Sequence, residues 1–170
     1  RSERDIGYSR LILATGSGSN FFKTPGAQGH AHVLEDAEDA REFHARLIQL
    51  FLAAAYEGRP QLAIAIVGAG ATGTEWAAEI LVGYQALAQG LPPAQHFKLG
   101  ITLIEASGRI LGGLANEVSA NVQAELQRRG IEVRTGTRVE AVTPEGLQTT
   151  SGWIDADAVV WAAGVLASPE

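Results

Sequence analysis

Three glycines at regular spacing, Gly68, Gly70 and Gly73, lie within the sequence Gly-Ala-Gly-Ala-Thr-Gly. The apolar, β-branched run directly before them, residues 61–67, predicts a strand, and the residues that follow predict a helix. In such a unit the first glycine lets the chain turn tightly, the second lets the backbone approach a diphosphate, and the third lets the helix pack closely on the strand. The spacing therefore predicts a site for the pyrophosphate of a dinucleotide.

The first turn of the predicted helix supplies the hydrogen-bond donors for this site. Ala71, Thr72 and Gly73 begin the helix, so their backbone N–H groups have no partner inside it. These amides, together with the positive end of the helix dipole, favour a negatively charged group. A glycine segment alone is weak evidence, but this one follows a strand, opens a helix and precedes an acid on the next strand.

The acid is Glu105, at the end of a strand predicted over residues 100–105. A carboxylate there can accept hydrogen bonds from both hydroxyls of the adenosine ribose and would repel a 2′-phosphate. This favours NAD(H) over NADP(H), although Arg109 lies close enough in sequence to serve a phosphate instead. The acid is further from the glycines than the usual roughly 20 residues, because residues 90–99 form an insertion before the strand.

Two other interpretations of the glycine segment stay open. The glycines can shape a tight turn that binds nothing, and S-adenosylmethionine methyltransferases also combine a glycine turn with an acid on the next strand. The three context conditions, met together, favour a dinucleotide over both.

Alternating strands and helices surround these residues. Strands are predicted at residues 8–15, 61–67, 100–105, 131–134 and 157–163, and helices at residues 35–58, 71–88 and 116–129. Three further short strands, at residues 138–142, 146–150 and 152–154, are separated by turn residues. This order predicts an α/β fold: a Rossmann-like parallel sheet with crossover helices, plus a three-stranded antiparallel β-meander.

Composition excludes several classes of function. The net charge of -6 and the lack of a basic run argue against nucleic acid, and the absence of cysteine excludes disulfides and thiolate chemistry. The longest apolar run, residues 47–56, is too short to be a transmembrane segment. The four histidines have no partner pattern that predicts a metal site. The sequence contains no methionine, even at position 1, so we expect a piece of a longer protein.

Several segments resemble type II NADH dehydrogenases, which are single-subunit flavoproteins with two dinucleotide-binding domains. The similar segments are Tyr-x-x-Leu-Ile-Leu-Ala-Thr-Gly-Ser at residues 8–17, Asn-Phe-Phe-x-x-Pro-Gly at 20–26, residues 66–75 around the glycines, Glu-Ala-x-x-Arg-Ile-Leu at 105–111 and residues 159–165. Lys23 stands where the family usually has a glycine.

The resemblance implies a domain organisation. Residues 1–170 would be a single NAD(H)-binding domain from the middle of such a flavoprotein, with its core at about residues 60–155. Residues 1–20 and 156–170 would be the two crossing points to the FAD domain. The family's FAD-binding glycine motif and its membrane-associated C-terminal helices are not in this sequence.

The resemblance also implies roles for three residues. Glu75 would lie on the first turn of the helix near the nicotinamide, where the family uses a glutamate to order the ring for hydride transfer. Its other interpretation is an acid that stabilises the helix dipole. Ala163 and Gly164 would flank the nicotinamide because they are small, or they simply end a strand.

The function implied is that of the NADH-binding domain of an FAD-dependent NADH:quinone oxidoreductase, an NADH dehydrogenase that transfers hydride from NADH to FAD. The isolated fragment is expected to be inactive, and the parent to be cytoplasmic and peripheral on the cytoplasmic face of the inner membrane. Two alternatives stay open: a related flavoprotein reductase with another electron acceptor, and a non-catalytic NAD(H)-binding regulatory module.

Overall fold

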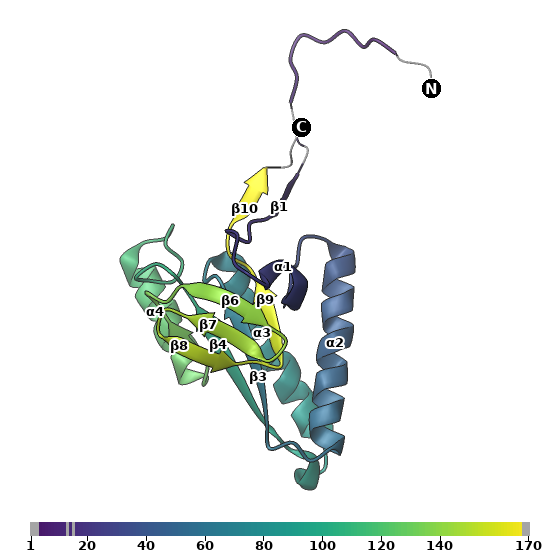
Figure 1. Ribbon diagram of the computed structural model, residues 1–170, viewed down its shortest axis with the longest axis vertical. Coiled ribbons are helices and arrows are strands. Elements are labelled where there is room, and N and C mark those ends of the chain that lie inside the picture. Colours follow the sequence, from purple (N-terminus) through teal and green to yellow (C-terminus); the bar gives the residue numbers. More distant parts are fainter. Residues whose placement is uncertain (1–3, 13, 15, 168–170) are drawn as a thin grey trace.

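A five-stranded parallel sheet forms the centre of the molecule, in the order β2-β9-β3-β4-β5 (Figure 1). The computed structural model describes residues 4–12, 14 and 16–167. The sheet strands are β2 (Ala31–His32), β3 (Gln61–Val67), β4 (Lys98–Ile104), β5 (Glu132–Arg134) and β9 (Ala158–Trp161). The predicted Rossmann-like sheet is confirmed.

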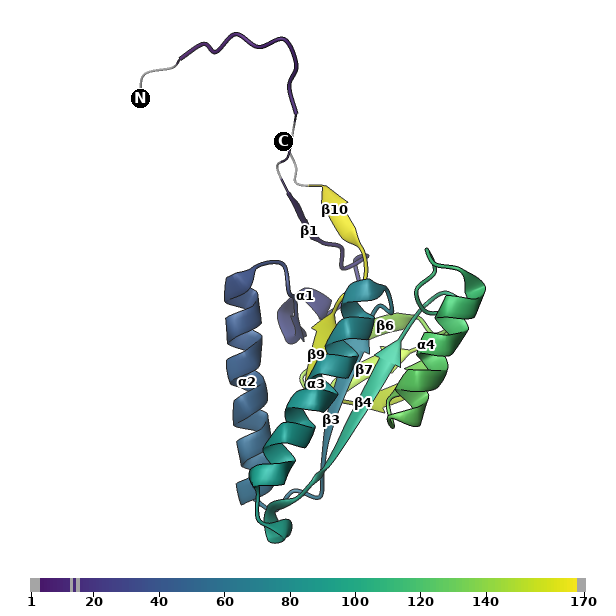
Figure 2. The same ribbon diagram turned by 180° about the vertical axis from the view of Figure 1, so that it is seen from behind.

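Helices cover one face of this sheet and a smaller sheet covers the other (Figures 1 and 2). The helical layer consists of α2 (Ala37–Tyr56), α3 (Ala71–Gly90) and α4 (Asn116–Arg128). The opposite layer is the predicted antiparallel meander of β6 (Val139–Thr143), β7 (Gly146–Thr149) and β8 (Gly152–Asp155), together with the short α1 (Ala27–His30). A 3-10 turn, η1 (Pro93–Gln95), lies in the connection before β4.

The two layers explain why β9, and β3 from its second residue on, are continuously apolar. Ile64 and Ile66 pack into the core beneath the helices, whereas Ala65 and Val67 pack into the core beneath the meander. Because successive side chains of a strand point to opposite faces, a strand that is buried on both sides needs a continuous apolar run. The two cores include buried residues from Ala27 on α1 to Trp161 on β9.

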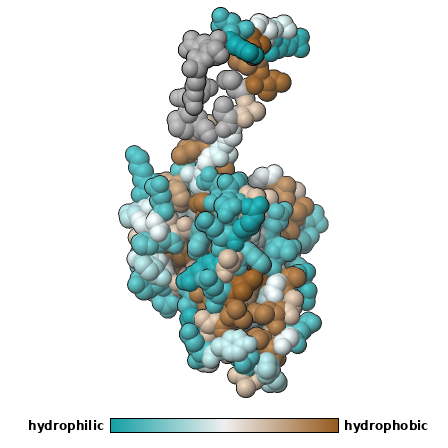
Figure 3. Space-filling model, turned by 90° about the vertical axis from the view of Figure 1, so that its right-hand side faces the viewer, coloured by the Kyte–Doolittle hydropathy of each residue, from teal (hydrophilic) through white to brown (hydrophobic). Residues whose placement is uncertain are grey.

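Helix α2 begins at an aspartate cap and packs by one face. The Asp36 carboxylate accepts hydrogen bonds from the N–H groups of Glu38 and Asp39, at 2.8 and 2.9 Å, which lowers the pKa of Asp36. On its buried face Phe43 is fully buried, with its ring 5.7 Å from that of Trp76 on α3. The outer face exposes Ile48 and Leu52, and this side of the molecule carries apolar patches (Figure 3).

A two-stranded ribbon projects from the sheet end and pairs residues 17–19 with residues 165–167 (Figures 1 and 2). It pairs β1 (Ser17–Ser19) with β10 (Val165–Ala167) in antiparallel register, so that Ser19 lies opposite Val165. The chain thus enters and leaves the packed body side by side.

The prediction of a buried strand over residues 8–15 is wrong for the described residues of that segment. Residues 8–12 and 14 form no strand and are exposed, with Ile12 at 88% of its full accessibility. Positions 13 and 15 lie outside the described residues. An apolar run of this kind indicates a strand only where a neighbouring strand pairs with it, and no strand of the described part of the chain pairs with these residues.

Smaller differences concern the ends of elements and the segment before α2. Strand β4 spans Lys98–Ile104, so it begins earlier than predicted and ends just before Glu105. The short α1 and β2 were not predicted, and His30 ends a helix while His32 lies in a strand. Among the described residues, no helix is both long enough and apolar enough to cross a membrane.

Candidate dinucleotide-binding site

Two of the three predicted glycines are required by contacts within the protein. Gly68 has a φ of +99°, and a Cβ there would lie 2.7 Å from the carbonyl of Ala162. A Cβ on Gly73 would overlap the carbonyl oxygen of Gly68, so this residue lets α3 pack against its own turn. Both are buried. Their predicted roles in turning and packing are supported by this geometry.

Gly70 is different, because nothing among the described residues requires a glycine there. It is the exposed N-cap of α3, with φ -71° and ψ -170°, angles that other residues also adopt. No described atom outside its chain neighbours lies within 4 Å of the place where its Cβ would be. The space in front of Gly70 is open, which is what close approach of a ligand to the backbone needs.

The start of α3 presents backbone N–H groups to this open space. The first helical hydrogen bond at this end is made by the Thr74 N–H, which donates to the Gly70 carbonyl at 3.1 Å. Ala71 and Thr72 are exposed, and within the described part of the chain no side chain caps this helix end. Such an end fits a diphosphate in both hydrogen bonding and charge.

Glu105 lies directly beside the glycine turn. One carboxylate oxygen accepts a hydrogen bond from the Ala69 N–H at 2.9 Å, and the other accepts one from the Ser107 N–H at 2.8 Å. Each oxygen keeps further acceptor capacity, because a carboxylate has about four lone-pair sites. The half-buried acid is thus oriented by the backbone at the position where an adenosine ribose would follow the diphosphate.

Ala163 and Gly164 lie on the other side of the turn, after β9. Gly164 has a φ of +69°, and a Cβ there would come within 2.6 Å of the Phe22 ring. The Trp161 indole N–H donates to the carbonyls of Asn20 and Ala163, at 2.9 and 3.1 Å. Contacts within the protein therefore require a glycine at position 164, independently of any role in binding.

A cavity of about 200 Å³ connects these two groups of residues. Its lining includes Ser19, Glu35, Thr72, Trp161, Ala162 and Gly164. It lies at the carboxyl ends of β3 and β9, where the chain order reverses: β3 leads to β4 and β5 on one side, and β9 lies on the other. Open parallel sheets bind their ligands at such a switch point. The structure thus brings the predicted glycines, Glu105 and Gly164 to one edge of the sheet.

Comparison with known proteins decides the family. The family model described as pyridine nucleotide-disulphide oxidoreductase matches residues 1–170. The chain belongs to this oxidoreductase family.

Relatives within the family agree with the resemblance inferred from sequence. The chain is 36% identical, over 99% of its length, to a mitochondrial external alternative NAD(P)H-ubiquinone oxidoreductase of Arabidopsis thaliana, and covers 31% of that protein. It is also 36% identical, over 97% of its length, to a type II NADH:quinone oxidoreductase of Haemophilus influenzae, and covers 41% of it. The chain therefore spans less than half the length of these relatives.

Solved structures show the same fold. The NDH2 of Plasmodium falciparum in complex with NADH superposes with a TM-score of 0.83 at 21% identity, over 96% of this chain and 36% of that one. A ferredoxin reductase from Rhodopseudomonas palustris superposes with a TM-score of 0.74 at 20% identity, over 96% of this chain and 36% of that one. The predicted fold class is confirmed.

Glu75 is the fifth residue of α3. It therefore lies one residue beyond the first turn of the helix, where it was predicted to lie. It is exposed, and no acid lies in the first turn itself. The interpretation of Glu75 as an acid that stabilises the helix end is weakened, since that effect falls off within the first turn.

Sequence reasoning noted Lys23 but missed two other residues near the site, Phe22 and Glu35. Phe22 and Lys23 adopt φ values of +50° and +58°, a left-handed conformation that glycine adopts without strain. Glu35 also reaches the cavity, and its carboxylate accepts a hydrogen bond from the Ser19 N–H at 2.5 Å. The only sequence signal at Glu35 was the group of acids at the start of α2, which indicated the start of a helix and not a binding site.

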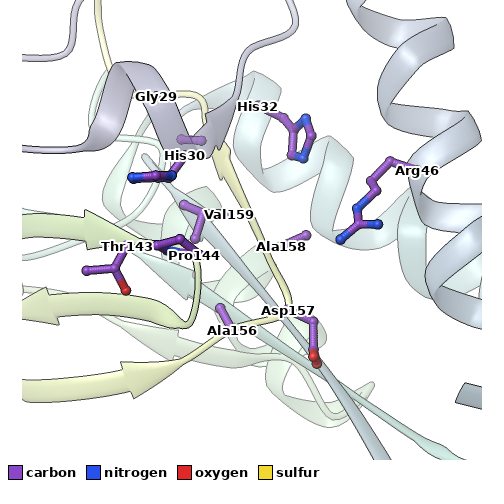
Figure 4. A pocket seen from close by; sticks show the side chains of 11 residues that line it. Gly29, His30, His32, Arg46, Thr143, Pro144, Ala156, Asp157, Ala158 and Val159 are labelled. Atoms are coloured by element: carbon purple, nitrogen blue, oxygen red, sulfur yellow. The ribbon is translucent and has the colours of Figure 1, made fainter. Parts of the chain in front are cut away.

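A larger cavity of about 360 Å³ lies at the opposite, amino-terminal edge of the sheet (Figure 4). His30, His32 and Arg46 line it, and the two histidine rings point in different directions. Burial lowers the pKa of His32, and the Arg46 guanidinium lowers it further. Asp157 is paired with Arg59 at 2.5 Å. Among the described residues, no group of three or more potential ligands is placed to hold a metal ion.

Proposed function

We propose that this chain is the NADH-binding domain of an FAD-dependent NADH:quinone oxidoreductase. The observation that carries the proposal is Gly70, a glycine that no described contact requires, at the exposed start of a helix with free amides. The relatives named as NADH:quinone and NAD(P)H-ubiquinone oxidoreductases support the choice of dinucleotide and of acceptor.

Different residues of the site bind different parts of the dinucleotide. The amides of Ala71, Thr72 and Gly73 hold the pyrophosphate, with Gly70 allowing its approach. Glu105 accepts hydrogen bonds from the hydroxyls of the adenosine ribose. This arrangement directs the nicotinamide toward the cavity beside Gly164.

Glu75, Ala163 and Gly164 act at the nicotinamide end. Gly164 and Ala163 leave room beside the ring, and Glu75 orders the ring from α3. When bound in the full-length protein, FAD would supply the acceptor for the hydride of NADH and the redox chemistry that carries two electrons to a quinone. The protein's own contribution is orientation, because NADH must present one ring face at reacting distance.

The domain organisation proposed for the full-length protein is one NAD(H)-binding domain inserted into an FAD domain. The pairing of β1 with β10 supports this, since it brings the chain in and out at one place, as an inserted domain requires. The crossing points are then residues 1–20 and 156–170. The cytoplasmic location, with the parent at the inner membrane surface, stays a prediction.

Titration of NADH into this chain, followed by calorimetry, tests the binding step. We expect saturation below millimolar concentration, with S-adenosylmethionine giving no heat under the same conditions. A flat NADH titration up to millimolar would overturn the proposal, and binding of S-adenosylmethionine instead would indicate a methyltransferase.

Stopped-flow reduction of the flavin in the full-length protein tests the hydride step. Wild-type protein is expected to lose flavin absorbance on mixing with NADH, and Glu75→Gln to slow this loss while changing the NADH dissociation constant little. NADH binding without any flavin reduction would favour a non-catalytic, regulatory module.

A related reductase with another acceptor is the second candidate, because the fold is shared with a ferredoxin reductase. Steady-state assays of the full-length protein with a soluble quinone and with a ferredoxin separate the two. Faster turnover with quinone supports the leading proposal, and faster turnover with ferredoxin supports the second candidate.

A further inference from the structure

The loop of residues 105–115, between β4 and α4, holds the glycine turn at Ala69 from two sides. The Ala69 N–H donates to the Glu105 carboxylate at 2.9 Å, and the Ala69 carbonyl accepts a hydrogen bond from the Leu111 N–H at 2.7 Å. Leu111 makes this bond with a φ of +50°, a left-handed conformation that leucine avoids. Because such a conformation persists only where its surroundings enforce it, something must hold Leu111 in place.

Arg109 contributes to this restraint, together with the Leu114 N–H, which donates to the Leu111 carbonyl at 2.8 Å. The Arg109 guanidinium donates to the carbonyls of Gly112 and Leu114, at 2.5 and 2.9 Å, and so closes the turn that contains Leu111. Its own carbonyl accepts a hydrogen bond from the Ser107 hydroxyl at 2.9 Å. Ser107 is the same residue whose N–H orients Glu105. Arg109 therefore connects the strained leucine with the acid of the site.

The hydrogen bonds of Arg109 also bear on whether its side chain can bind a 2′-phosphate. Its guanidinium is occupied by carbonyls of its own loop, so it is not presented toward the ribose as a partner for a 2′-phosphate. Arg134, which lies beside Ile104 in the neighbouring strand, donates to Glu132 at 2.8 Å. Arg109 and Arg134 are thus both engaged elsewhere, so neither guanidinium is presented to the ribose position beside Glu105.

We propose that Arg109 is a positioning residue that sets coenzyme choice: by closing the 105–115 loop it fixes Glu105 against Ala69, so that the site accepts a free 2′-hydroxyl and rejects a 2′-phosphate. This inference rests on the proposed binding of NADH. The choice between NAD(H) and NADP(H) then depends on the whole 105–115 loop. Replacing Arg109 is therefore expected to change this choice although its side chain touches no coenzyme.

The test measures dissociation constants of ADP-ribose and of 2′-phospho-ADP-ribose for wild type, Arg109→Gln and Arg109→Lys. We expect wild type to prefer ADP-ribose at least tenfold, Arg109→Gln to lose most of this preference, and Arg109→Lys to restore part of it because one ammonium can still bond a carbonyl. Arg41→Gln, a surface change on α2, should leave the preference unchanged. A role in stability alone would weaken both ligands equally and leave their ratio unchanged.

A second pair of variants keeps the test decisive if Arg109→Gln folds poorly. Leu111→Gly removes the strain that Arg109 restrains, so Arg109→Gln should change the ratio less in the Leu111→Gly background than in wild type. An unchanged ratio in every Arg109 variant overturns the inference and leaves NADH binding intact. Failure of wild type to bind ADP-ribose at all would instead overturn the proposed function.

Discussion

The two edges of the parallel sheet differ in where their polar groups find partners. At the amino-terminal edge the lining of the larger cavity, about 360 Å³, includes one acid, which is already satisfied: Asp157 binds Arg59 and accepts a hydrogen bond from the Ala63 N–H at 2.8 Å. At the carboxyl edge the cavity is only about 200 Å³, but the exposed helix start beside it has amides without a cap.

If the dinucleotide binds at the carboxyl edge, as proposed above, unpaired backbone groups indicate the site better than cavity size does. A polar group that the protein has already paired gains little from a ligand, whereas free amides at a helix start gain hydrogen bonds and charge stabilisation from an anion. The three glycines support the same conclusion. Contacts within the protein require a glycine at positions 68 and 73, but no described contact requires one at position 70. The following variants test whether the two edges behave as differently as this comparison implies.

The largest effect is expected from Gly68→Ala, which places a Cβ against the Ala162 carbonyl at a φ of +99°. We expect the free energy of unfolding to fall by roughly 3 kcal/mol, from steric overlap added to backbone strain. Urea denaturation measures it. Gly130→Ala is the matched control, because its φ is +90° but nothing among the described atoms lies within 4 Å. It should cost about 1 kcal/mol, and equal losses would contradict the overlap.

Gly70→Ala should separate binding from folding. The new methyl meets no described atom, so the free energy of unfolding should change by less than about 0.5 kcal/mol. The methyl would occupy the approach of the diphosphate, so the NADH dissociation constant should rise roughly 30-fold, about 2 kcal/mol. Calorimetry measures both ligand affinity and stability. Gly29→Ala, at the amino-terminal edge, should leave NADH affinity unchanged; the comparison fails if the two variants behave alike.

Glu105→Gln should weaken NADH binding by about tenfold, because a hydrogen bond to a charged group contributes roughly 1.5–3 kcal/mol. The glutamine keeps one acceptor oxygen for the Ala69 N–H, so the fold should persist. Glu140→Gln on strand β6 removes the same charge at an exposed position of the meander. Unaltered NADH affinity in Glu105→Gln, or an equal loss in both variants, would remove Glu105 from the site.

The sequence predicted the glycine turn, Glu105 and the meander because each depends on local signals: a continuous apolar run, turn glycines and the period of two. It could not place residues 8–15, since an apolar run does not say which strand will pair with it. The four-residue α1 and two-residue β2 are too short to show a period. The role of Arg109 depends on which way a long side chain turns, and only coordinates show that.

Asp157→Asn should lower stability by about 1 kcal/mol without affecting NADH binding, which sharpens the contrast between the edges. The pair with Arg59 is partly exposed, with side-chain accessibilities of 36% and 24%, so its contribution is modest. A double-mutant cycle with Arg59→Gln isolates the interaction by urea denaturation. A changed NADH dissociation constant in Asp157→Asn would show that the two edges are coupled.

The smallest effect concerns the pH dependence of stability at the amino-terminal edge. Burial and the Arg46 guanidinium lower the pKa of His32 below 6.5, while the nearby Glu42 partly opposes this. The unfolded chain therefore binds more protons than the folded one at and just below pH 6.5, so this contribution to stability is complete above that pH and is lost as the pH falls below it. Thermal unfolding from pH 8 to pH 5 should show a shallower decline for His32→Gln than for wild type, with His44→Gln on the exposed side of α2 as control. Parallel declines in all three would mean that His32 titrates alike in the folded and unfolded states.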